Sequence, residues 1–329
     1  MGSQVAGKPH ALCVPFPAQG HINPMMQLAR LLHSKGFYIK FVNSEFNQDR
    51  ITEANGHVPA TGFDDFRLES IPDGLPPSYG RTTNVLELCD FWTTSACGYW
   101  AYLQIPVLME RGYTPLKDSS CLADRLETIL DWTTDPDDFL FNYNHTVAQM
   151  ALRTSTLILN TFYDLEKDVI EAMRSRIACP LYTIGPLLTF CEHESKGEDK
   201  SISTSLWKLE NECLAWLDQQ QPNGWNSMLE AICNGVPIMS WPYVGEQQTN
   251  CRYACIEWGF GMETGNNVKR DEVEAEVKEL IEGTNGKEMR TKIMKWKQIA
   301  ENAIKPGGPS YKNLDTLVKE VLLKNYKND

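Results

Sequence analysis

The segment Ala11-Leu-Cys-Val-Pro-Phe-Pro-Ala-Gln-Gly-His-Ile-Asn-Pro24 decides the fold. Its first six residues are a short apolar run of the kind that forms a buried strand. Residues 17–20 interrupt this run with Pro and Gly, which favour a turn. Asn23 followed by Pro24 is typical of a helix with an Asn N-cap and a proline at its first position. The segment therefore predicts a strand that leads through a loop into a helix.

The residues that follow complete a βαβ unit. Apolar side chains recur at helical spacing over residues 25–32, and Lys35-Gly36 is a typical helix end. Residues 37–42 are the next predicted strand. Such crossovers are right-handed and join parallel strands, so the loop after the first strand lies at the carboxyl edge of the sheet. Because open α/β sheets bind ligands at this edge, we expect an α/β fold with a ligand site here.

His21 lies in that loop, directly after Gly20. An imidazole that titrates near neutral pH is suited to take a proton from a hydroxyl group, which makes His21 a candidate general base. The same residue would equally serve as a helix cap without a chemical role. This segment alone does not separate the two interpretations.

A second candidate site is the run Gly224-Trp-Asn-Ser-Met-Leu-Glu230, which leads into an apolar helix. Small residues at a helix start let a phosphate approach the free N–H groups, and Glu230 follows Asn226 by one helical turn, where it suits a ribose diol. Asn234-Gly235 ends the predicted helix, residues 236–242 form a strand, and Glu246-Gln247 follow at its carboxyl edge. An ordinary capped helix remains the alternative for this pattern.

Composition and charge exclude several classes of function. The chain has 329 residues, of which 42% are hydrophobic, and this size suits two globular domains. Its formal net charge of −12 repels nucleic acid and anionic lipid surfaces. We find no signal-peptide pattern and no apolar run near the ~18 residues of a membrane span. Ten cysteines without a CxxC motif predict reduced thiols, and we expect a cytoplasmic monomer.

Five motifs, in chain order, resemble plant UDP-sugar-dependent glycosyltransferases of the GT-B fold. They are PFPAQGHINP (residues 15–24), FWTTSAC (91–97), LNTF (159–162), YTIGP (182–186) and the run over residues 224–250. The likeness is strongest to transferases that glucosylate cyanohydrins, terpenols and similar small hydroxylated metabolites. The resemblance implies two Rossmann-like domains that face each other across a cleft.

The resemblance also implies a role for each candidate residue. His21 would deprotonate the acceptor hydroxyl, which then attacks the anomeric carbon with inversion as UDP leaves. The donor-binding residues would be Trp225, Asn226 and Ser227 at the sugar and diphosphate, Glu230 at the ribose, and Glu246 and Gln247 at the hexose. UDP-glucose is then a co-substrate, and the resemblance implies no metal ion or other cofactor. Asp135-Pro-Asp137 looks like a metal-binding DxD motif, but a solvated loop beside proline is the better interpretation.

Three departures from the family pattern indicate that internal segments are missing. They fall around 90/91, 132/133 and 223/224. The first removes a strand and the aspartate that orients the histidine, and Asp90 does not replace it. The third removes strands of the second sheet together with a tryptophan that stacks on uracil. Both domains are therefore expected to be incomplete, with apolar faces and strand edges exposed.

The predicted organisation follows the family. Residues 1–188 form a partial acceptor-binding domain, 189–204 a polar linker, and 205–329 a partial donor-binding domain whose last helix returns to the first domain. The predicted function is transfer of a hexose, favouring glucose, to a hydroxyl of a small plant metabolite. A non-catalytic remnant is the alternative. A nucleotide-dependent oxidoreductase is disfavoured because the first loop has no GxGxxG motif.

Overall fold

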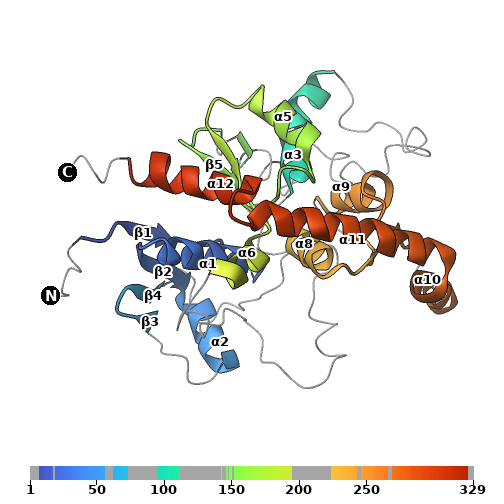
Figure 1. The fold of residues 1–329 in the computed structure, drawn as a ribbon, viewed down its shortest axis with the longest axis horizontal. Coiled ribbons are helices and arrows are strands. Elements are labelled where there is room, and N and C mark those ends of the chain that lie inside the picture. The colour runs from blue at the N-terminus through green and yellow to red at the C-terminus, as the bar shows by residue number, and fades with distance from the viewer. Residues whose placement is uncertain are drawn as a thin grey trace. The chain divides into compact units, whose positions relative to one another are not determined.

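The computed structural model describes residues 7–17, 19–55, 62–72, 95–111, 142, 146, 148–149, 152–194, 224–242, 246–265 and 269–324. The chain divides into two compact units, whose elements are labelled in Figure 1. Unit 1 comprises Met1–Trp92, Leu187–Gln220 and Leu314–Asp329, and unit 2 comprises Thr93–Pro186 and Gln221–Asn313. The junctions predicted at 90/91 and 132/133 lie outside the described residues. The assignment of acceptor-binding and donor-binding domains stays a prediction.

Unit 1 contains a four-stranded sheet in the order β1-β2-β4-β3. Its strands are β1 (His10–Cys13), β2 (Tyr38–Ser44), β3 (Gly62–Phe63) and β4 (Phe66–Ile71). β1, β2 and β4 are parallel, and β3 pairs antiparallel with β4. Helix α1 (Gln19–Ser34) connects β1 to β2, and Gly36 after it has a φ of 91°, which glycine adopts without strain. The predicted βαβ unit with parallel strands is confirmed.

The predicted start of α1 is wrong by one turn. The helix begins at Gln19, so Asn23 is not its N-cap and Pro24 lies inside the helix, where it is buried. Proline supplies a helical φ and removes only one N–H donor near the helix start, and the Gln19 amide donates to Asn23 Oδ1 at 2.7 Å across the added turn. His21 therefore lies in the first turn of α1.

The two faces of the sheet differ in burial. Ile39, Phe41 and Phe66 are fully buried on the face that packs against α1. On the opposite face Val42 is 8% exposed, but Leu12 is 67% exposed, and the side chains of Lys40 and Glu69 form an exposed ion pair at 3.1 Å. Parallel sheets are usually covered on both faces. The open face agrees with the expectation that an incomplete sheet exposes apolar residues.

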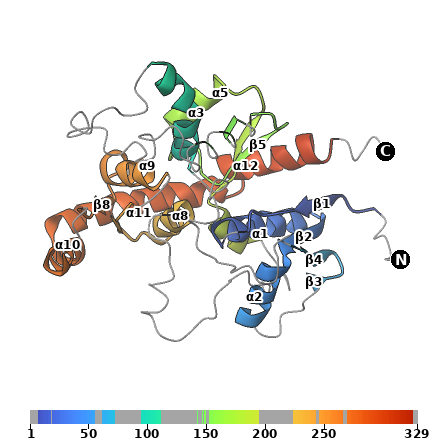
Figure 2. The ribbon, with the colours of Figure 1, turned by 180° about the vertical axis from the view of Figure 1, so that it is seen from behind.

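Three more helical segments belong wholly to unit 1. They are α2 (Glu45–Asn55), α6 (Leu187–Glu194) and the π-helical η5 (Leu317–Leu322). α6 packs against α1, as Figures 1 and 2 both show. The Nζ atom of Lys35, directly after α1, lies 3.4 Å from Glu194 Oε2 and 3.7 Å from Asp315 Oδ1. The residues of the C-terminal helix from Leu314 onward are thus part of unit 1.

Unit 2 contains two short parallel pairs of strands and most of the helices. The strands are β5 (Leu157–Leu159) with β6 (Leu181–Thr183), and β7 (Ile238–Ser240) with β8 (Gly261–Glu263). The helical segments are α3 (Ala96–Glu110), α5 (Lys167–Arg174), α8 (Trp225–Asn234), α9 (Gln247–Arg252), the π-helical η4 (Tyr253–Glu257), α10 (Arg270–Glu282), α11 (Thr284–Ile304) and the first residues of α12 (Pro309–Thr316).

The helices predicted after residue 224 are confirmed. Apolar periodicity in the sequence predicts helices at 246–258, 270–283, 286–303 and 310–324, and these ranges correspond to α9 with η4, α10, α11, and α12 with η5. Gly235 ends α8 in the left-handed conformation with a φ of 72°, as predicted. In the part of this region that the structure describes, β7 and β8 are the only strands. β7 lies inside the predicted strand 236–242, and β8 lies inside 259–264, which the sequence offers as a second candidate strand.

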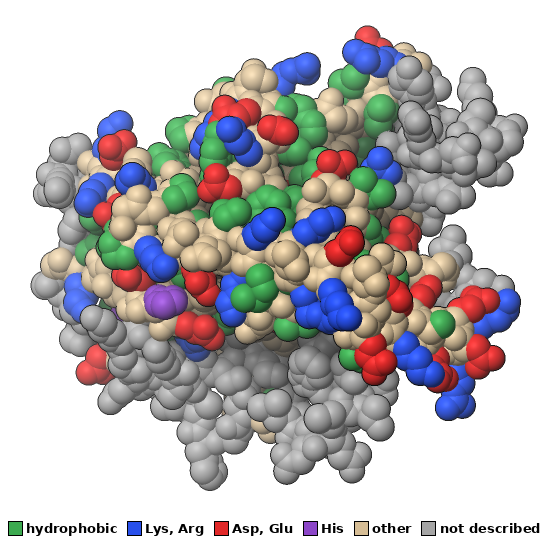
Figure 3. Space-filling model, turned by 45° about the vertical axis from the view of Figure 1, so that its right-hand side comes forward, with side chains coloured by type: hydrophobic (Ala, Val, Ile, Leu, Met, Phe, Trp, Pro, Cys, Tyr) green, Lys and Arg blue, Asp and Glu red, His purple; other side chains and the backbone are tan. Residues whose placement is uncertain are grey.

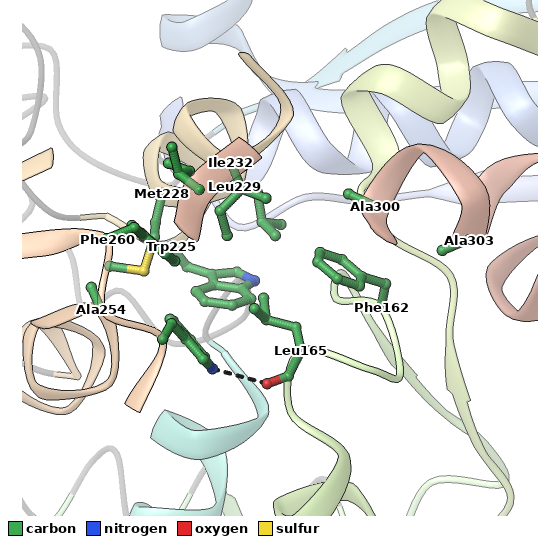
Figure 4. Packing of buried hydrophobic residues seen from close by; sticks show 12 residues of the cluster. Phe162, Leu165, Trp225, Met228, Leu229, Ile232, Ala254, Phe260, Ala300 and Ala303 are labelled. Atoms are coloured by element: carbon green, nitrogen blue, oxygen red, sulfur yellow. Dashed lines mark hydrogen bonds between the residues drawn. The ribbon is translucent and has the colours of Figure 1, made fainter. Parts of the chain in front are cut away.

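The core of unit 2 is a cluster of large apolar side chains. It joins Phe162 and Leu165 to α8, η4 and α11, with Trp225 between them (Figure 4). Trp258 and Phe260 also belong to this cluster. The indole N–H groups of both tryptophans have hydrogen-bond acceptors in the core. Trp225 Nε1 donates to Asn160 O at 2.7 Å, and Trp258 Nε1 donates to Leu165 O at 3.0 Å. Helices that were patterned to cover a sheet thus also bury apolar surface against one another.

Charged side chains of both signs are interspersed on the described surface (Figure 3). Two exposed ion pairs at α10 each join side chains one helical turn apart. They are Lys269–Glu272, whose lysine is the N-cap residue, and Lys278–Glu274. Such exposed pairs contribute little stability. No continuous basic surface is seen in this view that would offset the net charge of −12.

Candidate functional site

The start of α8 carries the residues that the resemblance assigns to the diphosphate. Gly224 is the N-cap, with an extended backbone (φ −62°, ψ 145°), and no described side chain caps the first turn. A Cβ atom added at Gly224 would meet no atom within 4 Å. The first N–H groups of a helix attract anions. The helix start therefore suits a diphosphate sterically and electrostatically.

Trp225 and Asn226 are fixed by a residue of another segment. Asn160, which follows β5, accepts the indole N–H of Trp225 through its main-chain oxygen and donates its Nδ2 to Asn226 Oδ1 at 3.1 Å. The Trp225 side chain is 1% exposed and points into the core (Figure 4). A contact between Trp225 and a donor would consequently involve main-chain atoms. Asn226 is half-buried beside it.

Ser227 and Glu230 are exposed on the first turns of α8. They are three residues apart, so they lie on neighbouring positions of one helix face. Asn226 lies on this face one turn before Glu230. The predicted spacing of one helical turn between Asn226 and Glu230 is present in the structure, and their roles toward a donor stay predictions.

Glu246 and Gln247 lie at the start of α9, after the carboxyl end of β7. Glu246 is the N-cap residue and is half-buried, and its main-chain oxygen accepts the N–H of Asn250 at 2.8 Å. Gln247 is 9% exposed. The placement of both residues beyond the end of a parallel strand follows the sequence prediction. Of the two side chains, Glu246 is the more accessible.

His21 lies in unit 1, in the first turn of α1. Its side chain is 2% exposed, and the ring of Phe16 meets it edge-on with centroids 5.2 Å apart. A buried imidazole reacts with a hydroxyl only when neighbouring groups give way. The six donor-side residues all belong to unit 2.

Asn160 is the site residue that sequence analysis missed. It belongs to the quoted LNTF motif, directly after a short apolar strand, and its hydrogen bonds fix the first two residues of α8. An asparagine directly after the apolar run of residues 157–159 was the available signal. A Cβ atom added at Gly185 would lie 2.6 Å from Asn160 Oδ1, so the packing here requires glycine.

A buried carboxylate lies at the start of α3 in the same unit. Glu166 is 2% exposed and accepts the main-chain N–H groups of Ala96 at 3.1 Å and Cys97 at 2.8 Å. Burial raises the pKa of Glu166, although the hydrogen bonds from these N–H groups oppose the shift. The carboxylate satisfies a helix start from within the protein.

The described ranges hold neither a metal-binding cluster nor a membrane-spanning helix. These contain no group of three or more His, Cys, Asp or Glu side chains arranged to hold a metal ion. Asp135 and Asp137 lie outside these ranges, as does Asp90. No helix in the described part is both long and apolar enough to cross a membrane. The cysteines with described positions carry free thiols.

Comparison with known proteins identifies the family. Residues 221–307 match the family described as UDP-glucoronosyl and UDP-glucosyl transferase, and residues 10–72 match a glycosyltransferase N-terminal domain. The chain is 35% identical to 7-deoxyloganetin glucosyltransferase from Gardenia jasminoides, with 98% of this chain and 100% of the relative covered. It is 34% identical to (R)-mandelonitrile beta-glucosyltransferase from Prunus dulcis, with 96% and 98% covered. The chain belongs to the UDP-dependent glycosyltransferase family.

Solved structures show the GT-B fold of this family. The crystal structure of TcCGT1 in complex with UDP matches with a TM-score of 0.72 at 18% identity, over 97% of this chain and 100% of that chain. Os79 from O. sativa in complex with UDP matches with a TM-score of 0.70 at 18% identity, over 94% and 99%. The predicted α/β fold class and family are confirmed.

The alignments also show that the relatives contain additional internal residues. The match to the Gardenia jasminoides transferase extends over 483 positions, whereas this chain has 329 residues. At least 154 positions (483 minus 329) therefore have no residue in this chain. This agrees with the interpretation that internal segments are missing. The three predicted junctions stay predictions.

Proposed function

We propose that this chain transfers glucose from UDP-glucose to a hydroxyl group of a small plant metabolite, with inversion at the anomeric carbon. The observation that supports this most is its similarity, over nearly its whole length, to two named glucosyltransferases. Their named acceptors, 7-deoxyloganetin and mandelonitrile, favour a small hydroxylated acceptor here. UDP-glucose would act as co-substrate, without a metal ion, in a cytoplasmic monomer.

In the proposed mechanism, His21 takes the proton from the acceptor hydroxyl. The acceptor oxygen forms a bond to the anomeric carbon while the bond from that carbon to the diphosphate breaks, and the electron pair leaves with UDP. The open N–H groups at the start of α8 would stabilise the negative charge of the leaving diphosphate. Since His21 is buried beside Phe16, we expect the acceptor to displace part of this packing.

On the donor, Trp225, Asn226 and Ser227 would meet the sugar and diphosphate, the first through its main chain. Glu230 would accept hydrogen bonds from the ribose, and its exposure on α8 permits this. Glu246 and Gln247 would bind hexose hydroxyls at the start of α9.

The test compares His21→Ala with His193→Ala, an exposed histidine on α6 that serves as control. Turnover of UDP-glucose is measured in this chain and in a version that carries the Gardenia jasminoides segments at the three predicted junctions. We expect His21→Ala to lower turnover by roughly 100-fold or more. His193→Ala should leave it unchanged. Full turnover in the His21 variant would remove the proposed base, and an inactive restored version would contradict the proposed function.

A further inference from the structure

The short helix α9 depends on contacts with other segments for its position. Its six residues, Gln247–Arg252, continue directly into the π-helical η4, and a helical stretch of this combined length is marginal by itself in water. The proposed hexose contacts lie at its start. What fixes α9 therefore fixes these contacts.

Asn250 connects α9 to the start of α3. Its side chain is fully buried, and its Oδ1 accepts the hydroxyl of Ser95, which is also fully buried, at 2.6 Å. Ser95 is the N-cap of α3, and its Oγ accepts the N–H of Gly98 at 2.9 Å. One hydroxyl group thus joins α9 to α3.

The same asparagine closes the first turn of α9. The main-chain N–H of Asn250 donates to the main-chain oxygen of Glu246 at 2.8 Å. Asn250 consequently contacts the residue that carries a proposed hexose contact and the residue that caps α3. It contacts the first through its main chain and the second through its side chain.

The partner helix is itself firmly held at this end. Glu166 accepts the N–H groups of Ala96 and Cys97, the two residues after Ser95. α3 thus offers a fixed reference point for α9. The Nδ2 group of Asn250 has no hydrogen-bond partner among the described residues.

We infer that Asn250 and Ser95 are positioning residues for the hexose part of the donor. They hold Glu246 and Gln247 in place without contacting the sugar themselves. This inference rests on the proposed function for the role of those two residues. The contacts that carry it are independent of that function.

The test compares the affinities of UDP and UDP-glucose by calorimetry. The variants of the full chain are Asn250→Ala, Ser95→Ala and the double variant. Arg252→Ala, at an exposed residue of the same helix, is the control. We expect each single variant to lower the preference for UDP-glucose over UDP by about 3- to 10-fold, the range of one lost hydrogen bond. The double variant should lose little more, because both changes remove the same contact.

Ser95→Thr keeps the hydroxyl and should retain the wild-type preference. A loss of affinity for UDP and UDP-glucose by the same factor in Asn250→Ala would indicate a general structural role and overturn the inference. If the losses of preference for UDP-glucose in the two single variants add up in the double variant, the inference is overturned as well.

Amide hydrogen exchange separates this inference from the proposed function. In Asn250→Ala we expect faster exchange in α9, with exchange in α10 unchanged. If the wild-type chain shows no preference for UDP-glucose, the proposed hexose contacts fail, and the exchange measurement still decides the positioning role. Unchanged exchange in α9 would refute it.

Discussion

The open face of the sheet in unit 1 gives the sharpest prediction about this chain. Leu12 in β1 is 67% exposed, whereas Ile39 on the neighbouring strand β2 is fully buried on the opposite face. We consider the substitutions Leu12→Lys and Ile39→Ala. If the face is open, a charge at position 12 meets water.

The expected change in the free energy of unfolding follows from the exposed fraction of each side chain. Full burial of a leucine side chain contributes about 1.5–3 kcal/mol, so a side chain that is one-third buried contributes about 0.5–1 kcal/mol. Leu12→Lys should therefore lower the free energy of unfolding by no more than about 1 kcal/mol. Ile39→Ala creates a cavity in the core and should lower it by about 2–5 kcal/mol. In a sheet covered on both faces, the two substitutions would both be severe.

Urea unfolding followed by circular dichroism measures both effects, and a dye such as ANS reports exposed apolar surface. Leu12→Lys should lower dye fluorescence, while Ile39→Ala should raise it. A loss of more than about 2 kcal/mol in Leu12→Lys would mean that Leu12 is covered in solution. The inference of an open sheet face would then be wrong.

Two further predictions concern buried polar groups of unit 2. Because burial raises the pKa of Glu166 above its ordinary 4.5, the folded state holds the proton more strongly than the unfolded state. The stability from this group is present below pH 4.5 and is lost as pH rises through the folded pKa. Glu166→Gln should flatten this decline in a series of urea midpoints from acid to neutral pH, and an unaltered pH profile would contradict it. Trp258→Phe removes the donor to Leu165 O and should cost about 1–3 kcal/mol in the same assay, whereas Trp241→Phe, at a half-exposed side chain, should change stability by less than about 0.5 kcal/mol. Equal effects of the two tryptophan substitutions would contradict the role of this hydrogen bond.

Local sequence patterns predicted the helices and strands well, because apolar periodicity and helix-ending residues act over only a few residues. The parallel β1–β2 pair, the stop of α8 at Gly235 and the four helical stretches after residue 246 all follow from such signals. The start of α1 could not be predicted from such signals, since Asn23-Pro24 is equally compatible with a helix that has begun one turn earlier. A proline near a helix start loses one hydrogen bond, which tertiary packing compensates.

The candidate site was predictable by residue type and less so by environment. Spacing placed Glu246 beyond a strand end and Ser227 on the first turn of α8, as observed. Sequence does not indicate that the Trp225 indole points into the core or that His21 is 2% exposed, because burial depends on segments distant in the chain. Asn160 was missed for the same reason, as its partners lie about 65 residues further along.

The character of β1 bears on whether the chain lacks segments or has evolved a smaller fold. In the described sheet β1 is an edge strand, with β2 on one side. Natural edge strands carry charges, proline or bulges that prevent pairing with other chains. The strand His10–Cys13 has no Lys, Arg, Asp, Glu or Pro. Leu12 on its open face is 67% exposed, and Val14, directly after the strand, is 52% exposed. This is the pattern of an interior strand of a parallel sheet. Together with at least 154 alignment positions (483 minus 329) that only the relatives fill, it indicates that β1 was selected inside a larger sheet.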